Sequence, residues 1–451
     1  MTVNDRRDLL IEQVREYHRE ISVEQEFVPG VTPLLPAGAV LAEEDRVALV
    51  SAALDLRMTS GDISVRFERA LARRLGLRKA HMVNSGSSAN LLALSALTAH
   101  ELGERRLRPG DEVITVAAGF PTTVNPIIQN GLVPVFVDIE LGTYNTTPER
   151  VAAAIGPRTR AIMIAHPLGN PYQAEELAEL AREHGLHFVE DNCDALGSTY
   201  RGRLTGTFGD LSTVSFYPAH HITTGEGGCV LTRSVKLARL VESYRDWGRD
   251  CWCLPGKDNT CLKRFEHQMG TLPPGYDHKY IFSHIGYNLK STDLQAALGE
   301  TQLTKLDEFG RLRRRNWARL REALDGLPGL LLPRPTEGSD PSWFGFVITV
   351  LPDAPYTRAE LVAFLEARAI GTRRFFAGNL TRQPAYAHAN YRVAGTLENS
   401  DTVTEHTFWI GVHPRLTPEM VDYLAESVRE FVTSRRSPVL AVPDLPGRAG
   451  A

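Results

Sequence analysis

Long apolar runs are missing from this chain of 451 residues, so no segment is suited to cross a bilayer. The first ten residues, MTVNDRRDLL, lack the apolar stretch of a secretory signal. A positive field is also missing: 50 Lys and Arg stand against 54 Asp and Glu, and the formal net charge of −4 argues against nucleic acid as a partner. We therefore expect a cytoplasmic protein that binds neither a membrane nor nucleic acid.

Cysteine and lysine are both scarce. Five cysteines in so long a chain are too few for a disulfide framework, and in a reducing cytosol clustered thiols more often bind metal or take part in chemistry. Only seven lysines are present. A motif that needs a lysine and has none is therefore easy to recognise.

The middle of the chain alternates short apolar runs with amphipathic patterns. The pattern consists of strand-like segments 112–119, 133–139, 161–169, 187–192, 211–218 and 228–233 and helix-like segments 89–99 and 174–185. Apolar runs separated by amphipathic helices predict an α/β fold, with a mainly parallel sheet that helices cover on both faces.

The domain organisation follows from changes in composition. Residues 1–38 predict a polar helix and a proline-rich segment, and residues 39–300 a large cofactor-binding domain. Within that domain, residues 250–283 are rich in Pro, Gly and Cys and too long for a plain connection, which indicates a function. A helix pattern over 292–322 leads into a smaller C-terminal α/β domain, residues 301–433. The proline-rich tail, 434–451, is expected to be disordered.

Three segments carry candidate binding groups. Asp191 ends a predicted strand, where ligands gather at the carboxyl edge of a parallel sheet. The segment NSGSSAN, from Asn84, opens a helix whose small residues and dipole suit a phosphate. Either feature alone is more often a structural Asp or a helix cap. The third segment, SFYPAHHITTGEGG from Ser215, is far more specific.

Together these segments resemble the sugar aminotransferases of the DegT/DnrJ/EryC1/StrS family, over nearly the whole chain. The resemblance implies the type I aminotransferase fold and a vitamin B6 cofactor. It implies that Asp191 pairs with the pyridinium nitrogen, that Phe120 stacks on the ring, and that Gly86, Ser87 and Ser215 contact the phosphate. Asn288 matches an asparagine that reaches the phosphate from the neighbouring subunit, which implies a homodimer.

His220 departs from the family pattern. Aminotransferases of the family carry a lysine at this position of the Ser-Phe-x-Pro loop, because lysine holds pyridoxal phosphate (PLP) as a Schiff base. Imidazole forms no stable imine but can transfer a proton near neutral pH. The replacement favours pyridoxamine phosphate (PMP), bound without a covalent link, and resembles the 3-dehydrases of deoxysugar pathways. A dead enzyme is the alternative. His221 is expected to line the pocket wall or face solvent.

Four cysteines follow a recognisable pattern. Cys193 lies two residues after Asp191, Cys251 and Cys253 flank one residue, and Cys261 follows. The pattern resembles the ligands of the [2Fe–2S] cluster in the iron–sulfur 3-dehydrases of this family, and four thiolates suit such a cluster. Buried structural thiols or a zinc site are the alternatives, although zinc favours paired ligands two to four residues apart. Cys229 is expected in the core.

The segment from Gly371 to Pro384 also resembles the dehydrase branch. It offers charged and neutral donors for a diphosphate and a sugar, although an Arg-rich loop is more often a solvated face. The candidate substrate contacts are Arg373, Asn379, Arg382 and Gln383.

The sequence thus predicts a PMP- and [2Fe–2S]-dependent 3-dehydrase acting on a nucleotide-linked 4-keto-6-deoxyhexose or its 2,6-dideoxy counterpart. CDP and dTDP remain possible carriers. By family likeness, a flavin-dependent NAD(P)H reductase or a ferredoxin or flavodoxin system would supply electrons. The alternatives are a GDP-sugar 3-dehydrase without a cluster, a residual aminotransferase, and a redox- or cofactor-sensing regulator without catalysis.

Overall fold

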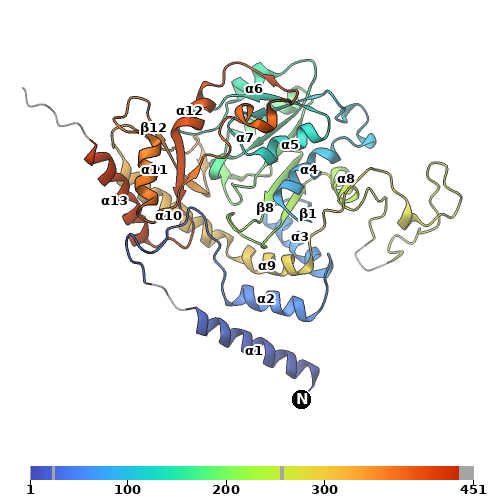
Figure 1. The fold of residues 1–451 in the computed structure, drawn as a ribbon. Coiled ribbons are helices and arrows are strands. Elements are labelled where there is room, and N and C mark those ends of the chain that lie inside the picture. The colour runs from blue at the N-terminus through green and yellow to red at the C-terminus, as the bar shows by residue number, and fades with distance from the viewer. Residues whose placement is uncertain (1, 23–25, 254–257, 436–451) are drawn as a thin grey trace, which may run out of the picture.

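A computed structural model describes residues 2–22, 26–253 and 258–435 (Figure 1). Most of the predicted tail, 436–451, lies outside the described residues. Two β-sheets carry the main layers, the larger near the labels β1 and β8 and the smaller near β12 (Figure 1). Within the described ranges, no helix is both long and apolar enough to span a membrane.

The larger sheet has eight strands in the order β1-β9-β8-β5-β4-β2-β3-β14. Its strands are β1 (Lys79–Val83), β2 (Glu112–Val116), β3 (Val133–Val137), β4 (Thr159–Ala165), β5 (His187–Asp191), β8 (Leu211–Ser215), β9 (Gly228–Thr232) and β14 (Arg392–Val393). The strands from β8 to β14 pair in parallel, whereas β9 runs antiparallel to both β1 and β8. The mainly parallel sheet predicted from the apolar runs is confirmed.

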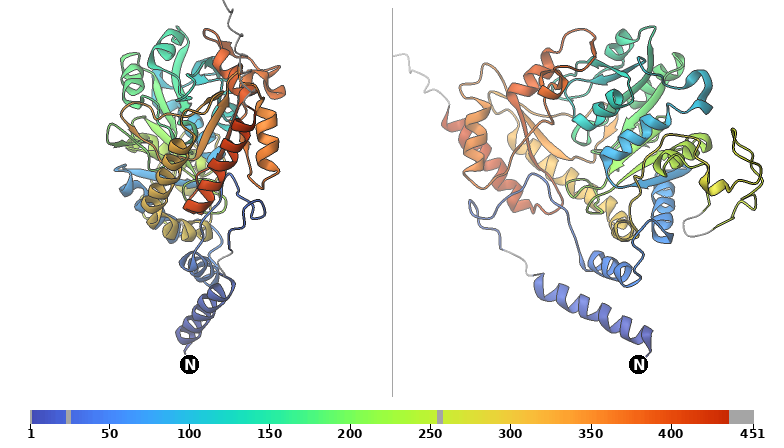
Figure 2. Two further views of the ribbon diagram at one scale, coloured as in Figure 1. Left: turned by 90° about the vertical axis from the view of Figure 1, so that its left-hand side faces the viewer. Right: turned by 45° about the vertical axis from the view of Figure 1, so that its right-hand side comes forward.

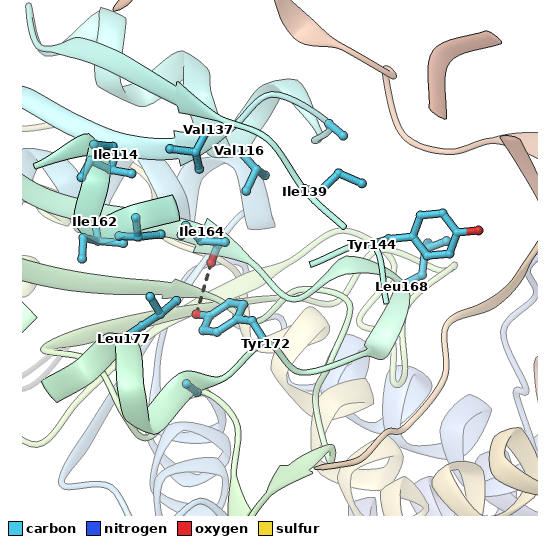
Figure 3. Packing of buried hydrophobic residues seen from close by; sticks show 14 of the residues in the cluster. Ile114, Val116, Val137, Ile139, Tyr144, Ile162, Ile164, Leu168, Tyr172 and Leu177 are labelled. Carbon is cyan, nitrogen blue, oxygen red and sulfur yellow. Dashed lines mark hydrogen bonds between the residues drawn. The ribbon is translucent and has the colours of Figure 1, made fainter. Parts of the chain in front are cut away.

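Helices cover both faces of this sheet, which explains why its strands are apolar throughout. Along β4, Ile162 and Ile164 point into one buried cluster, while Ala161 and Met163 point into the other. Figure 3 shows the first cluster, in which the Tyr172 hydroxyl donates to the Ile164 carbonyl (3.4 Å). Helices α6 (Pro148–Ala154) and α7 (Ala174–Glu183) cover this face, and α4 (Gly86–Ala96) and α8 (Val235–Arg245) the opposite one.

A second sheet is built from the C-terminal part of the chain. Its order is β10-β12-β15-β13, with all pairs antiparallel, and its strands are β10 (Leu330–Leu331), β12 (Gly345–Val350), β13 (Arg373–Arg374) and β15 (Thr407–Gly411). Its core includes side chains of α10 (Leu306–Leu324), α11 (Arg358–Glu366) and α13 (Pro418–Ser434). The helix predicted over 292–322 is two helices, because the chain turns at Lys305 between α9 (Asp293–Thr304) and α10.

The remaining elements connect or flank these two sheets. They are α1 (Val3–Ile21), α2 (Glu43–Leu54), α3 (Asp62–Arg74), α5 (Pro121–Gln129), α12 (Glu398–His406), a small sheet of β11 (Ser339–Asp340), β6 (Thr199–Tyr200) and β7 (Arg203–Leu204), and the 3-10 turns η1 (His100–Arg105), η2 (Pro167–Gly169), η3 (His278–Tyr280), η4 (Leu380–Arg382) and η5 (Pro384–Tyr386). Helix α1 packs on α2 and extends away from the body (Figures 1 and 2).

An irregular arm projects from the end of α8. We call residues 250–253 and 258–283 the cysteine arm; its only regular element in the described residues is η3. The arm leaves the molecule at the end opposite β12 and α13, and Figure 1 and the right-hand view of Figure 2 show it standing clear of the body.

Candidate functional site

A pocket of about 900 Å³ opens where several strands end. Asp191 ends β5, Ser215 ends β8, and Gly86 begins α4, so the topology alone brings them to one sheet edge. The pocket brings together the following sequence-predicted residues: Gly86, Ser87, Phe120, Asp191, Cys193, Ser215, His220 and Arg373. The proline-rich segment after α1 forms part of its wall through Leu35 and Pro36.

Asp191 is a buried carboxylate with three donors around it. Its Oδ2 accepts from Asn90 Nδ2 (2.8 Å) and Thr123 Oγ1 (2.7 Å), and its Oδ1 accepts from the Cys193 amide (3.2 Å). The Asn90 amide is itself oriented, because Thr213 Oγ1 donates to its Oδ1 (2.5 Å). The three hydrogen bonds fix the direction of the carboxylate. The carboxylate can therefore hold a protonated ring nitrogen.

The start of α4 forms a cradle for an anion. Ser85 caps the helix by accepting from the Ser88 amide (3.0 Å), and the amides of Gly86 and Ser87 precede the first intrahelical bond. A side chain at Gly86 would meet Ser215 Cβ at 2.5 Å, so only glycine allows this close approach. Ser87 is exposed and Ser215 is buried at the pocket wall. A phosphate fits between them.

Phe120 provides an aromatic face at the entrance. It stands at the start of α5 with 51% of its surface exposed, although it is a large apolar side chain. Its ring meets Phe376 edge to face, with 6.3 Å between centroids. An exposed aromatic ring at a pocket mouth is suited to stack on a flat ligand.

His220 faces the pocket from the loop that follows β8. Asp194 Oδ1 lies 3.3 Å from its Nδ1, although this contact lacks the alignment of a hydrogen bond, and Nδ1 has no other hydrogen-bond partner among the described residues. The ring of Phe344 packs against the imidazole with 5.3 Å between centroids. With Nδ1 turned to Asp194, Nε2 is the nitrogen available to a ligand. Asp194 is a site residue that the sequence analysis missed.

Arg313 supports the histidine loop from behind. This fully buried side chain on α10 donates to the His220 carbonyl (3.3 Å) and to the carbonyls of Trp343 (3.2 Å) and Phe344 (3.4 Å). Burial lowers the pKa of Arg313 to about 10, while the negative charge of Asp194 opposes the shift. The arginine thus joins the loop to the beginning of β12.

His221 points away from the pocket into the interior. Its Nε2 donates to the Ser342 carbonyl (2.6 Å), and the ring is 2% exposed. Burial lowers the pKa of His221 well below its usual value, and the Arg313 charge adds to the effect. A solvent-facing position for His221 is therefore wrong, and it does not line the main pocket either.

The predicted substrate contacts separate into two groups. Arg373 lines the pocket, together with its neighbour Arg374. The other three lie outside the residues that line it and bond to protein groups: Asn379 Nδ2 donates to Asp401 (2.9 Å), Arg382 pairs with Asp401 (3.2 Å) and Glu405 (2.8 Å), and Gln383 Nε2 donates to the Ala377 carbonyl (2.7 Å). Asn288 is exposed and also lies outside the pocket of its own chain.

The four predicted cluster ligands lie at two places. Cys193 lines the main pocket, and burial together with the nearby Asp191 charge raises the pKa of its thiol well above the usual value. Cys251, Cys253 and Cys261 line a separate small cavity in the cysteine arm. Among the described residues, no group of three or more His, Cys, Asp or Glu side chains is arranged to hold a metal ion. One chain alone does not gather the four thiols.

Residues 41–429 match the model of the DegT/DnrJ/EryC1/StrS aminotransferase family. The chain belongs to this family. The resemblance predicted from the sequence is confirmed, and so is the aminotransferase-like fold, a mixed sheet with flanking helices.

Several known proteins are similar to this chain in sequence or structure. A dTDP-4-dehydro-2,6-dideoxy-D-glucose 3-dehydratase of Saccharopolyspora spinosa is 68% identical over 430 residues, 95% of this chain and 93% of that protein. The lipopolysaccharide biosynthesis protein RfbH of Salmonella typhimurium is 52% identical over 96% of this chain and 99% of its own. The solved structure of E. coli GDP-4-keto-6-deoxy-D-mannose-3-dehydratase with bound hydrated PLP superposes with a TM-score of 0.79 at 29% identity, covering 88% of this chain and 99% of that one.

For a DegT/DnrJ/EryC1/StrS member, the pocket residues fit a phosphorylated pyridine cofactor. The fit rests on the buried Asp191 carboxylate with its three donors, the glycine-dependent cradle of α4 and the exposed ring of Phe120. None of the residues that line the pocket is a lysine. The family's imine-forming amine is therefore missing from the place where the cofactor fits.

Proposed function

We propose that the protein is a 3-dehydratase of a nucleotide-linked 4-keto-deoxyhexose that uses PMP bound without a covalent link. The observation that carries the proposal is His220, which lines the pocket beside Asp194 while no pocket-lining residue is a lysine. A proton-transferring imidazole in place of an imine-forming amine suits elimination of a hydroxyl rather than transfer of an amino group.

In this proposal the chain positions the cofactor by three contacts. Asp191 holds the ring nitrogen protonated, Phe120 covers one face of the ring, and the cradle of Gly86, Ser87 and Ser215 binds the phosphate. When bound, the cofactor supplies an amine that condenses with the 4-keto group and a ring that accepts electrons. The buried setting of Asp191 strengthens its electrostatic contact, because little water screens it.

His220 moves the proton. Its Nε2 would take up a proton in the pocket beside the bound cofactor and would deliver it to the C3 hydroxyl of the sugar, which would leave as water. Asp194, 3.3 Å from Nδ1, stabilises the imidazolium formed between these two steps. Phe344 limits rotation of the ring, and Arg313 fixes the loop through the His220 carbonyl. His220 and Asp194 therefore need no lysine to complete the proton transfer.

The substrate is proposed to be a dTDP-linked 4-keto-2,6-dideoxyhexose. The support is the 68% identical relative, whose name states that sugar and that carrier. Arg373 and Arg374 line the same pocket as His220 and offer two guanidinium groups to a diphosphate. Asn379, Arg382 and Gln383 lie outside the residues that line this pocket, so we assign the diphosphate contact to the two arginines.

We further propose that the enzyme is a homodimer in the cytoplasm and that it carries a [2Fe–2S] cluster. A flavin-dependent reductase, or a ferredoxin or flavodoxin system, would supply electrons to this cluster. The support is the set of Cys193, Cys251, Cys253 and Cys261, since such a cluster is bound by four thiolates and passes electrons singly. No catalytic step is assigned to the cluster, because a single chain holds only three of these thiols in one cavity.

A GDP-sugar 3-dehydratase without a cluster is the second candidate. Its support is the match with the E. coli enzyme over 88% of this chain and the separation of Cys193 from the three arm cysteines. This candidate predicts a colourless protein as isolated without cofactor, whereas the first predicts a brown one with about two irons per chain.

Anaerobic turnover with matched sugars tests the proposal. The protein, supplied with PMP and a reducing system, should remove the 3-hydroxyl of the dTDP-linked 4-keto-2,6-dideoxyhexose in preference to CDP- and GDP-linked 4-keto sugars. Borohydride reduction with PLP should leave the polypeptide unlabelled. Transfer of an amino group to the sugar, or a lysine that borohydride labels, would contradict the proposal.

A further inference from the structure

We infer that the proline-rich segment after α1 selects the substrate by its sugar: Leu35 contacts carbon 2 of the hexose and favours a sugar that lacks the 2-hydroxyl. We call residues 34–38 the strap. This inference rests on the proposed function, which assigns the diphosphate to Arg373 and Arg374 and the C3 hydroxyl to His220. The steps of that reaction do not use Leu35, although it lines the same pocket.

The first end of the strap is bonded to the smaller domain. The Leu34 amide donates to the Ala369 carbonyl (2.8 Å), and the Gly371 amide donates to the Leu34 carbonyl (2.9 Å). These bonds hold Leu34 beside Ile370 in a short parallel bridge, just before β13. The strap therefore begins next to the strand that carries Arg373.

The other end of the strap reaches the histidine loop. Gly38 and His220 both line the main pocket, and they also share a second, smaller cavity. Beyond Gly38, Gln302 Nε2 donates to the Val40 carbonyl (2.9 Å), which ties the chain to α9. From Leu35 to Gly38 the chain spans at most about 10 Å. The strap therefore leads from β13 to His220 along one wall of the pocket.

The middle of the strap is held by its backbone. His413 Nε2 donates to the Leu35 carbonyl (2.9 Å). At Gly411 a Cβ would lie 2.8 Å from the carbonyl oxygens of both Leu35 and Pro36, so the strap packs directly on the end of β15. The ring of Pro36 also fixes its φ angle. A backbone held in this way yields little room to an extra hydroxyl on a ligand.

Neighbouring leucines of the strap lie in different surroundings. Leu34 is 3% exposed and belongs to the core of the smaller domain, whereas Leu35 is 54% exposed and lines the pocket. The lining continues with Pro36, Ala37 and Gly38. None of these residues has a polar atom in its side chain. The strap therefore gives the pocket an apolar wall that offers a hydroxyl no side-chain partner.

The course of the strap identifies the sugar carbon that it meets. In the proposed substrate the diphosphate is attached at carbon 1, and the leaving hydroxyl is at carbon 3. Carbon 2 lies between them, so a wall that leads from Arg373 to His220 faces carbon 2. A hydroxyl on that carbon would lose its water against Leu35 without gaining a hydrogen bond, whereas a CH2 group would bury apolar surface. The strap thus suits a 2-deoxy sugar.

Turnover of two matched sugars tests this role. The substrates are the dTDP-linked 4-keto-2,6-dideoxyhexose and the dTDP-linked 4-keto-6-deoxyhexose, which differ only in the 2-hydroxyl. In the wild type, kcat/KM should be about 10²-fold higher for the 2-deoxy sugar. Leu35→Asn supplies a partner for the hydroxyl, so this ratio should fall about tenfold, mainly through a lower KM for the 2-hydroxy sugar. An active wild type without the preference, or an unchanged ratio in Leu35→Asn, would overturn the inference.

Leu41→Asn is the matched control. Leu41 is 56% exposed, close to the value for Leu35, but it lies outside the residues that line the pocket, so the ratio should stay at the wild-type value. An equal fall of the ratio in this variant would overturn the role of Leu35.

Equilibrium binding of the two sugars to the protein without PMP separates this inference from the proposed function. Leu35→Asn should bring the two dissociation constants about tenfold closer together, whether or not the protein turns either sugar over. If the wild type binds both sugars with the expected preference and dehydrates neither, the proposed reaction is wrong and the role of the strap is retained. Dissociation constants that keep their wild-type ratio in Leu35→Asn would remove the strap from substrate selection and leave the reaction untouched.

Discussion

The cofactor pocket and the cysteine arm differ in how complete they are within one chain. In the pocket, Asp191 has three donors and His220 has a carboxylate neighbour, all from the same subunit. In the arm, three thiols share a cavity without the fourth, and large apolar side chains face outward. The pocket is bounded by the two sheets, whereas the arm meets the body of its own chain beside α8, where the Arg239 guanidinium lies 5.1 Å from the centroid of the Trp252 ring.

The two regions are therefore held in place by different kinds of contact. The pocket is held by strand ends and helix starts, which the sheet places together whatever else the protein does. The arm is an irregular segment whose described residues are held by local contacts, such as the pair of Arg264 with Asp277. Replacements in the pocket should therefore change proton transfer and cofactor affinity, while replacements in the arm should change iron content and leave cofactor affinity unchanged.

His220→Asn should produce the largest effect. Asparagine fills similar space but cannot accept a proton, so the dehydration rate should fall by about 10²–10⁴-fold while PMP binds as before. Single-turnover rates measure the dehydration, and the cofactor absorbance measures the binding of PMP. If the variant kept the wild-type rate, the base would be another residue. Its iron content should equal that of the wild type, because His220 does not lie in the cysteine arm.

Asp191→Ala should come next, through cofactor affinity. The truncation removes the charge that faces the ring nitrogen and leaves Asn90 and Thr123 without their acceptor, a loss of about 2–5 kcal/mol in binding. Thr123→Val is the matched control, since it removes one donor and keeps the shape, at about 1.5–3 kcal/mol. Equilibrium titration with PMP measures both. Equal affinity in all three proteins would contradict the assigned role of Asp191.

Asp194→Asn should have a smaller effect, of about tenfold in kcat, which corresponds to about 1.4 kcal/mol. The amide has the same shape but cannot balance the charge on the imidazolium, and the 3.3 Å contact is not an aligned hydrogen bond, so a larger loss is not expected. KM and the cofactor absorbance should be unchanged. A change in KM with kcat intact would instead assign Asp194 to substrate binding.

Much of the pocket could be predicted because its signals are local. Asp191 ends an apolar run, and Ser85 with the glycine and serines after it carries the signature of a capped helix start. The histidine at 220 is a departure within one short motif. The family match confirms the resemblance on which these assignments rest, while the roles of the individual residues stay predictions.

The remaining site residues could not be predicted because their partners are distant in sequence. Arg313 meets the His220 carbonyl across 93 positions, and no local pattern distinguishes it from the arginines beside it. Asn379 and Arg382 resembled substrate contacts, but Asp401, on α12, accepts from both. The separation of Cys193 from the arm could not be predicted from the sequence either, because the spacing of cysteines along the chain does not indicate the direction in which a loop leaves the sheet.

A further effect falls on stability rather than on activity: it concerns the proline-rich segment that forms part of the pocket wall, and it depends on pH. His413 Nε2 donates to the Leu35 carbonyl (2.9 Å) beside the pocket, and burial lowers the pKa of His413 to about 4. Because the unfolded chain binds this proton near its usual pKa of about 6.5, the free energy of unfolding should fall as the pH drops from about 6.5 to 4, by about 1.4 kcal/mol per pH unit.

Urea unfolding of wild type and His413→Gln at pH 7 and pH 5 measures this contribution. Glutamine keeps a donor for Leu35 but has no proton to bind, so the variant should lose less stability than wild type between the two pH values. The exposed His388→Gln is the control and should follow wild type. Parallel losses in all three proteins would mean that His413 protonates equally in both states, and that the proline-rich segment is held to the pocket by packing rather than by a neutral imidazole.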